Sequence, residues 1–474
     1  MPNPPRVALN KRVQLINPPL MSTLKPGIRA GAYPPLHLAS LAAFLRERCP
    51  TVGVEVIDGE LYSIDEILSR VDADLVGISC NSLTYEPALQ IAGRAKAQGA
   101  LVVLGGAHPT FSGKLIVKNR PFVDAVVYGD GELALMGLVN GSTFPEIPNL
   151  IYRHENNICV NAETKLRLDD LPLPDYTGLP LDRYFNCYKA LYPDKPFQRP
   201  LSAYSSKGCQ WRDRAAGGCT FCAIQHIGFR IKPAAQYWKE LLSLHRDYNA
   251  DFFWDVSDTF TMQREWVRQF AAQRPPGTDF KFQVYGRASD IDDELARLLA
   301  DIGVYEVFLG LESGSNETLK ASRKGISVRS NLKAVANLNH AGVRVVVSVI
   351  LGLPNESDDT LAATMGMVED LLSTADLSEI NCSILMPLPG SRLMKELSER
   401  IGIREEDQDL FDPESLRRAW VEGFCDVGYE RLMEVQGQMR RLHRRVGTFG
   451  LTVSENAFQT QGQSTGTGTT LVNA

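Results

Sequence analysis

The chain has 474 residues, of which 44% are hydrophobic and 22% are charged, and its 50 basic and 56 acidic side chains leave a formal net charge of −6. This composition excludes a disordered chain, a collagen and a small disulfide scaffold, and the length suggests roughly three domains at about 150 residues each. The mildly negative charge gives no basis for holding a phosphate backbone, so we expect no nucleic-acid partner.

The cysteines and the composition of the N-terminal residues indicate in which cellular compartment the protein is expected. Residues 1–12 are basic and Pro-rich without an apolar stretch, and the longest apolar run, Val345–Leu353, is interrupted by Ser348 and Gly352. We therefore expect a reducing, cytoplasmic location and no membrane-spanning segment. Six of the nine cysteines are interpreted as small buried hydrophobic residues: Cys49, Cys80, Cys159, Cys187, Cys382 and Cys425.

Residues 12–140 alternate short apolar runs with amphipathic stretches of helical length such as Leu36–Arg48 and Tyr85–Gln98. The runs that we predict to be strands are Val13–Asn17, Val52–Ile57, Leu75–Cys80, Leu101–Gly105 and Ala125–Tyr128. This alternation predicts a doubly wound, Rossmann-like α/β domain over residues 1–140. Such a sheet binds ligands at the carboxyl ends of its strands.

The alternation resumes with a longer period from residue 201. The predicted strands are Leu201–Ser205, Asp251–Val256, Phe280–Tyr285, Glu306–Leu311, Arg344–Leu351 and Glu379–Leu385. The helical patterns that follow them begin near Pro233, Gln263, Asp292, Ser327, Asp358 and Arg392. These β-α units predict an open, partial (β/α)6 barrel of TIM type over residues 201–395, with its chemistry at the strand carboxyl ends.

Three regions lie outside these two modules. Residues 141–200 hold eight prolines and little periodicity, which predicts a Pro-rich linker carrying short strands. Residues 396–455 are strongly charged and predict a helical C-terminal region. Residues 456–474 carry no charge and are rich in Gln, Thr, Gly and Ser, so we predict a disordered tail.

Three cysteines share one loop directly after the first strand of the second module. Cys209 is followed by nine residues, then by Cys219, Thr220, Phe221 and Cys222. Three thiolates in one loop can hold a metal centre and leave one coordination position open for chemistry. A structural zinc site completed by His226 and a set of unrelated free thiols are the two alternatives.

This loop resembles the cluster loop of the radical S-adenosylmethionine (SAM) superfamily, although the usual spacing is three residues then two. The added residues look like a polar, flexible expansion of the first interval. Further fragments at successive strand ends resemble the same superfamily: Trp254–Phe260, Tyr285–Arg287, Phe308–Gly314, Ser348–Pro354 and Met386–Ser391. The resemblance implies a [4Fe-4S] cluster on Cys209, Cys219 and Cys222, and SAM contacts at Phe221, Ser257, Arg287, Gly310, Glu312, Ser348, Gly352 and Leu353. No catalytic side chain is assigned.

In the first module, glycines and small polar residues follow the predicted strands, in Gly77–Ser82, Gly105–Thr110 and Tyr128–Glu132. Neither a Gly-x-Gly-x-x-Gly motif nor a phosphate loop is present. Ahead of a radical SAM barrel, this module resembles the cobalamin-binding domain of the B12-dependent radical SAM class. The resemblance implies cobalamin contacts at Ser79, Asn81, Ser82, Thr84, Gly105, Gly106, His108, Gly129 and Glu132.

Two features of the first module have alternative interpretations: the lower ligand of the cobalt, and whether the module binds cobalamin. The Asp-x-His-x-x-Gly pattern of His-ligated cobalamin proteins is missing around His108. The resemblance therefore implies base-off cobalamin without a His ligand, and His108 is alternatively an ordinary helix-start or loop histidine. A degenerate module that binds no cobalamin is the other alternative.

The resemblance implies a cobalamin-dependent radical SAM methyltransferase. Such an enzyme moves a methyl group from SAM, through methylcobalamin, to an unactivated carbon of a small-molecule substrate, for example a natural product. It would draw electrons from a donor such as flavodoxin or ferredoxin. The alternatives are non-methylating radical chemistry such as cyclisation or ring contraction, a radical SAM enzyme acting on tRNA or a peptide, and a cobalamin- or metal-binding sensor.

Overall fold

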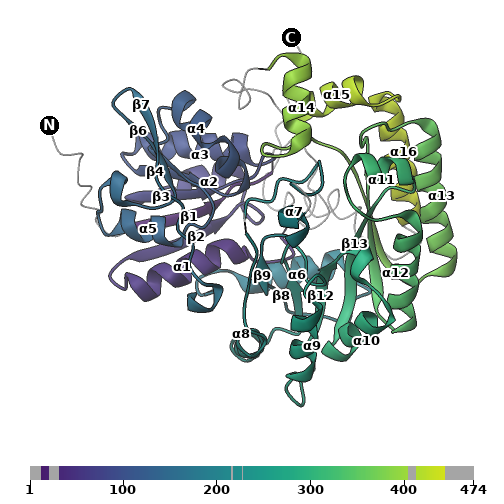
Figure 1. The fold of residues 1–474 in the computed structure, drawn as a ribbon. Coiled ribbons are helices and arrows are strands. Elements are labelled where there is room, and N and C mark those ends of the chain that lie inside the picture. Colours follow the sequence, from purple (N-terminus) through teal and green to yellow (C-terminus); the bar gives the residue numbers. More distant parts are fainter. Residues whose placement is uncertain (1–11, 21–30, 215–216, 227, 404–412, 444–474) are drawn as a thin grey trace, which may run out of the picture.

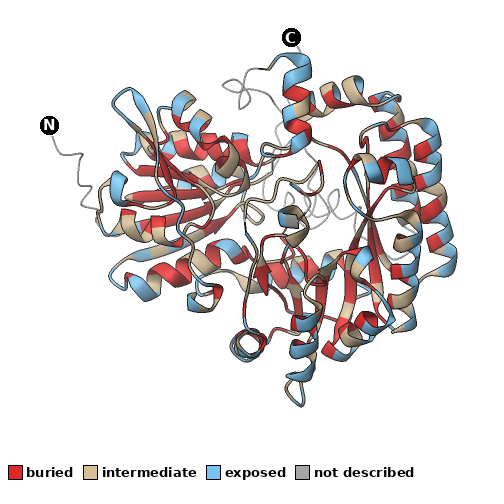
Figure 2. Ribbon diagram, viewed as in Figure 1, coloured by how far each residue is buried: buried red, intermediate tan, exposed pale blue. Residues whose placement is uncertain are grey.

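The computed structural model describes residues 12–20, 31–214, 217–226, 228–403 and 413–443. Two α/β units lie side by side, each built on its own sheet (Figure 1). Figure 2 shows the buried residues concentrated along both sheets and on the helix faces that cover them. A helix long and apolar enough to cross a membrane is absent from the described ranges. The predicted tail, residues 456–474, lies outside them.

The first unit is a mainly parallel sheet. Its strands within the described chain, in spatial order, are β2 (Gly53–Asp58), β1 (Arg12–Asn17), β3 (Leu75–Ser79), β4 (Leu101–Gly105), β5 (Ala125–Val127), β6 (Leu150–His154) and β7 (Asn157–Val160). The first five strands are parallel, and β6 and β7 continue the sheet antiparallel beyond residue 140. The strand order reverses at β1, and ligands bind beside such a reversal in this kind of sheet.

Helices cover both faces of this sheet. They are α1 (Leu36–Arg48), α2 (Ile64–Arg70), α3 (Tyr85–Ala97), α4 (Ala107–Asn119) and α5 (Glu132–Val139). Apolar residues of α1 and α5 pack on one face, and those of α2, α3 and α4 pack on the other. The doubly wound fold predicted from the alternating pattern is therefore confirmed, because strands buried on both faces read as continuous apolar runs.

The second unit is an open, all-parallel half-barrel. Its strands, in spatial order, are β15 (Leu377–Ile384), β14 (Arg344–Leu351), β13 (Val304–Glu312), β12 (Lys281–Gly286), β11 (Phe252–Asp255) and β8 (Pro200–Ala203). The helices along it are α8 (Ala234–Tyr248), α9 (Arg264–Ala272), α10 (Asp293–Ile302), α11 (Asn316–Ala321), α12 (Val328–His340), α13 (Asp358–Thr374) and α14 (Arg392–Ile401). The predicted partial barrel is confirmed, and the short helix α11 was not predicted.

The segment between the two units is more structured than the predicted linker. It contains helix α6 (Leu181–Leu191) in addition to β6 and β7. Tyr188 and Phe197 pack against Phe252 at the start of β11, and the Phe197 and Phe252 rings stack with centroids 4.3 Å apart. The segment thus covers the amino-terminal end of the half-barrel and leaves the carboxyl end open toward the first unit.

The charged C-terminal region forms α15 (Pro413–Phe424) and α16 (Tyr429–His443). Trp420 of α15 is fully buried, and its indole N–H donates to the carbonyl of Gly352 at 2.7 Å. Leu432 and Val435 of α16 join the same apolar cluster. The helical character of this region was predicted, but its apolar side completes the core beside β14 and β15.

Candidate functional site

The cysteine loop begins where β9 (Ser206–Lys207) leaves the half-barrel. β9 pairs with β10 (Arg230–Ile231), so this short ladder closes the base of the loop. The backbone N–H of Gly208 donates to a carboxylate oxygen of Asp258 at 2.7 Å. The ladder and this hydrogen bond anchor the loop at the carboxyl end of β8, where the sequence predicted it.

The long interval between the first two cysteines contains a helix. Residues Gln210–Arg214 form α7, and the carbonyl of Cys209 accepts the backbone N–H groups of Arg212 and Asp213 at 3.1 and 3.3 Å. The expected flexible expansion is therefore wrong for this half of the interval. Counting residues between cysteines could not reveal it, because an ordered helix and a loose loop can have the same length.

The three thiols lie within electrostatic range of one another. Burial, followed by the neighbouring Cys219 thiolate, raises the pKa of Cys222 to about 12, and Cys209 acts in the same direction. Burial also raises the pKa of Cys219, although Lys324 and Arg287 act against it. Metal binding must therefore displace protons from Cys219 and Cys222.

The described residues contain no group of three or more His, Cys, Asp and Glu side chains placed to hold one metal ion. A [4Fe-4S] cluster does not require such a common point, because each thiolate ligand binds a different iron atom. Three cysteines in one loop, with a fourth iron left for another ligand, fit this group.

Glu312 ends β13 in the same region. Its backbone adopts a φ of 63°, and its carboxylate accepts a hydrogen bond from the Lys324 ammonium at 2.6 Å. Both side chains are largely buried. A Cβ at Gly310 would lie 2.2 Å from the Glu312 carboxylate, so glycine is required where this carboxylate folds back over the strand.

A cavity of about 850 Å³ separates the two units. This volume is near the top of the usual range of about 300–1,000 Å³ for ligand sites. Its wall from the first unit includes Ser79, Gly105, Gly106, Gly129, Asp130 and Glu132, and its wall from the second includes Tyr204, Lys207, Phe221, Cys222, Trp254 and Asp258. The carboxyl ends of both sheets therefore open onto one space.

Comparison with known proteins identifies both units. The radical SAM superfamily matches residues 204–368, and the B12 binding domain family matches residues 29–139. The chain therefore belongs to the B12-binding radical SAM enzymes. Its cofactors are a [4Fe-4S] cluster, SAM and cobalamin.

Individual relatives are distant. The chain is 29% identical to an uncharacterised methyltransferase of Pyrococcus horikoshii over 81% of this chain and 82% of the relative. It is 25% identical to the anaerobic magnesium-protoporphyrin IX monomethyl ester cyclase of Rubrivivax gelatinosus, over 79% and 68%. The solved radical SAM methyltransferase TsrM from Kitasatospora setae matches with a TM-score of 0.63 and 20% identity, over 83% and 76%. This structural match shows a shared fold.

The first unit of this B12-binding radical SAM enzyme offers a bare backbone edge to the cavity. Gly106 has a φ of 98°, and a Cβ there would lie 2.6 Å from the carbonyl oxygen of Cys80. Gly105 and Gly129 line the cavity beside it. Glycines permit the close approach of a large ligand, so these residues fit the cobalamin that the sequence predicted here.

Four of the predicted cobalamin contacts do not line this cavity: Asn81, Ser82, Thr84 and His108. Asn81 and Thr84 bond each other at the start of α3, with the Asn81 N–H donating to the Thr84 hydroxyl at 3.0 Å. His108 lies in the first turn of α4, 3.0 Å from the Ser82 hydroxyl and stacked on Tyr85 with ring centroids 4.2 Å apart. Burial lowers the pKa of His108 to about 4. His108 therefore has the surroundings of an ordinary helix-start histidine, which was the alternative interpretation of this residue.

The structure places the predicted SAM contacts in different surroundings. Phe221 lines the cavity, with its ring centroid 5.9 Å from the Lys324 ammonium, and Ser348 pairs with Gly310 across β13 and β14. Ser257 is almost fully buried, and its hydroxyl accepts the N–H groups of Ser205 and Ser206, each at 2.9 Å. The structure thus gives Ser257 a role in holding the end of β8.

The other predicted SAM contacts, Gly352 and Leu353, lie beside the C-terminal helices. The N–H of Gly352 donates to Glu356 at 3.0 Å, and its carbonyl is the acceptor for Trp420 described above. Leu353 is fully buried in the apolar cluster that these helices complete. Arg287, the remaining contact, is buried at the end of β12.

A buried ion cluster joins the two units beside the cysteine loop. Asp130 of the first unit pairs with Lys207 at 2.9 Å and with Arg230 at 2.6 Å. His226 lies 3.5 Å from the same carboxylate. Burial and Lys207 lower the pKa of His226 to about 4, so its ring is neutral at pH 7. In the alternative zinc site, His226 would be the fourth ligand. The structure places it next to Asp130.

Sequence analysis missed Asp130, Lys207 and Lys324 as members of the site. Asp130 stands between two predicted contacts, Gly129 and Glu132, which is the one signal that pointed to it. Nothing in the sequence pairs it with Lys207, 77 positions away.

Proposed function

We propose that the protein is a methyltransferase that moves a methyl group from SAM, by way of cobalamin, to an unactivated carbon of a small-molecule substrate. When bound, the cluster and SAM supply the radical and cobalamin carries the methyl group. The cavity carries this proposal, because Phe221 and Cys222 of the cysteine loop and the glycines of the B12-binding sheet line the same space. Effective radical transfer needs the reacting groups to be held together away from water.

The chain's own residues would bind and enclose these groups. We assign Cys209, Cys219 and Cys222 to the cluster, Glu312 and Phe221 to SAM, and the edge at Gly105, Gly106 and Gly129 to cobalamin. Tyr33 and Trp254 pack with ring centroids 5.1 Å apart and line the cavity, where they would exclude water from the substrate. A low-potential donor such as flavodoxin or ferredoxin would supply the electrons.

Two comparisons support methyl transfer as the reaction class. The P. horikoshii relative is named a methyltransferase, and TsrM was solved with its tryptophan substrate and a SAM analogue. The relative of R. gelatinosus is named a cyclase, which supports a second candidate, a radical cyclisation without methyl transfer.

The test uses the full chain, purified without oxygen and reconstituted with iron, sulfide and cobalamin. After reduction with dithionite, SAM carrying a deuterated methyl group is added and the products are measured by mass spectrometry. A methyltransferase forms both S-adenosylhomocysteine and 5′-deoxyadenosine, and a cyclase forms only the nucleoside. Absence of both products from protein that holds zinc at its cysteines would overturn the radical assignment.

Cysteine variants test the unusual first interval. Cys209→Ala should lose the cluster and both products, because it removes one of three iron ligands. Cys159→Ala, in the distant strand β7, is the matched control and should keep full iron content. An intact cluster that cleaves SAM in Cys209→Ala would show that Cys209 is not a ligand.

A further inference from the structure

Helix α7 contributes a tryptophan to the side of the half-barrel where β12 and β13 end. The indole N–H of Trp211 donates to the carbonyl of Arg323 at 3.1 Å. The guanidinium carbon of Arg287 lies 4.1 Å from the Trp211 ring centroid. A Cβ at Gly325 would lie 2.2 Å from the same ring, so the neighbouring chain has a glycine where the indole packs. The inserted helix is therefore fitted to residues far from it in sequence.

Trp211 covers an arginine that other groups also hold. The Arg287 guanidinium donates to the Ser289 hydroxyl at 3.0 Å and to the carbonyl of Lys324. Its backbone N–H donates to the Thr261 hydroxyl at 3.0 Å. The two guanidinium acceptors are neutral, and the Asp290 carboxylate is a nearby negative charge that interacts with Arg287.

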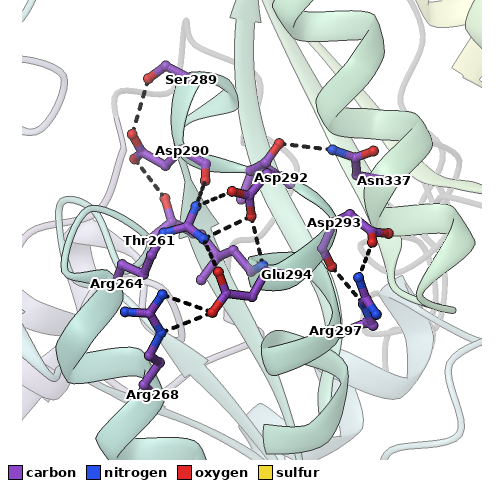
Figure 3. A network of polar contacts seen from close by, with 12 residues as sticks. Thr261, Arg264, Arg268, Ser289, Asp290, Asp292, Asp293, Glu294, Arg297 and Asn337 are labelled. Carbon is purple, nitrogen blue, oxygen red and sulfur yellow. Dashed lines mark hydrogen bonds and ion pairs between the residues drawn. The ribbon is translucent and has the colours of Figure 1, made fainter.

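A polar network stabilises the segment that carries Arg287 (Figure 3). The Asp290 carboxylate accepts hydrogen bonds from the hydroxyl groups of Thr261 and Ser289, each at 3.2 Å. Arg264 donates to the carbonyl of Asp290 at 3.0 Å and to the carboxylate of Asp292. Two of the groups that hold Arg287, Thr261 and Ser289, are thus bound by Asp290, which Arg264 of α9 holds in turn. Trp211 of α7 provides a separate contact to the guanidinium.

A second cation lies beside the first. Lys324 directs its carbonyl to Arg287 and its ammonium to Glu312. Burial acts to lower the pKa of Lys324, but Glu312 and Cys219 outweigh it and raise that pKa. Two buried positive charges therefore face the part of the cysteine loop that holds Cys219. The reduction potential of an iron–sulfur cluster depends on the charges and hydrogen bonds around its ligands.

We propose that the helix inserted between Cys209 and Cys219 is a positioning element, in which Trp211 fixes Arg287 and the adjoining Lys324 segment beside the cluster so that their positive charges favour its reduced state. Reduction adds one electron, and hence one negative charge, to the cluster. Loss of the indole would expose the Arg287 guanidinium to water, which weakens the effect of its charge on the cluster. The cluster would then be harder to reduce.

The experiment measures the midpoint potential of the cluster in the reconstituted full chain. Dithionite delivers one electron to each cluster in an anaerobic titration followed by electron paramagnetic resonance. Trp211→Ala should shift the potential to a more negative value, and Trp211→Phe, which keeps an aromatic face, should stay near the wild-type value. The Co(II)/Co(I) couple of bound cobalamin is recorded in the same samples and should not move. None of these readouts requires methyl transfer.

Two further variants separate positioning from a general loss of charge or structure. Lys320→Gln removes an exposed cation from α11 and should leave the potential near the wild-type value, because water screens that charge. Arg287→Gln should lower the potential at least as far as Trp211→Ala, and the double variant should go no further than Arg287→Gln alone. An unchanged potential in Trp211→Ala with a full cluster, or fully additive shifts, would overturn the proposal. If Trp211→Ala cannot hold the cluster, an unchanged potential in Arg287→Gln overturns it.

Discussion

Asp130 and Lys207 form an ion pair of 2.9 Å that joins the B12-binding sheet to the cysteine loop. Asp130 follows β5 at the edge where cobalamin is expected, and Lys207 stands two residues before Cys209. Burial acts to raise the pKa of Asp130, but Lys207, Arg230 and His226 outweigh it, so that pKa is lowered. The carboxylate therefore stays ionised and holds the two units in one arrangement.

Replacing Asp130 with Asn should destabilise the protein and loosen the contact between its units. The change leaves Lys207 and Arg230 without their shared carboxylate, and breaking a buried ion pair typically costs on the order of 3 kcal/mol. Urea unfolding followed by circular dichroism measures this loss. Asp72→Asn, which breaks the exposed Arg12–Asp72 pair, is the control and should leave stability close to wild type. Equal stability in both variants would contradict a linking role for Asp130.

Gly106→Ala should abolish cobalamin binding and leave iron content intact. The added Cβ would lie 2.6 Å from the Cys80 carbonyl, and the φ of 98° disfavours any side chain. The bare edge of the first sheet would therefore have to shift. Bound cobalamin is measured by its absorbance after desalting, and iron is measured in the same sample.

Gly93→Ala is the matched control for this variant. Gly93 lies in α3 with no neighbouring atom within 4 Å of an added Cβ. Alanine is also the better helix former, so the control should fold at least as well as wild type. Normal cobalamin loading of Gly106→Ala would show that the site lies elsewhere in the cavity.

His108→Phe should leave the spectrum of bound cobalamin unchanged. His108 lies outside the cavity lining and stacks on Tyr85, where phenylalanine can replace the imidazole ring. Electron paramagnetic resonance of the Co(II) state reports a nitrogen ligand directly. Loss of a nitrogen splitting on mutation would instead establish His108 as the lower cobalt ligand.

The strands and the cysteine loop could be predicted because their signals are local. A strand buried on both faces is a continuous apolar run, and three cysteines that share one loop are visible in the sequence itself. Asn81 and Thr84 show where local reasoning fails. Small polar side chains after a strand suit a ligand and the start of a helix equally well, and here they bond each other.

Long-range pairs could not be predicted from the sequence. Trp211 meets Arg323 112 positions later, and Asp130 meets Lys207 77 positions later. Trp211 and Arg323 both lie in the second unit, whereas Asp130 and Lys207 come from different units. In each pair the choice of partner depends on loop geometry that no single motif encodes. The same limit explains why α7 was interpreted as a flexible expansion.

Glu60 should make the stability of the protein fall as the pH rises from about 4.5 to about 7. Burial and the neighbouring Asp58 raise the pKa of Glu60 from its ordinary value of 4.5 to about 7. The folded protein thus holds this proton more tightly than the unfolded chain, so the stabilisation is complete below about pH 4.5 and is lost as the pH passes 7.

The variant Glu60→Gln, which keeps an acceptor for the Gly31 N–H, removes this dependence of stability on pH. Its stability relative to wild type should therefore increase by up to about 3 kcal/mol between pH 4.5 and pH 8. Urea unfolding of both proteins at the two pH values measures the difference, and a constant difference would show that folding does not raise the pKa of Glu60.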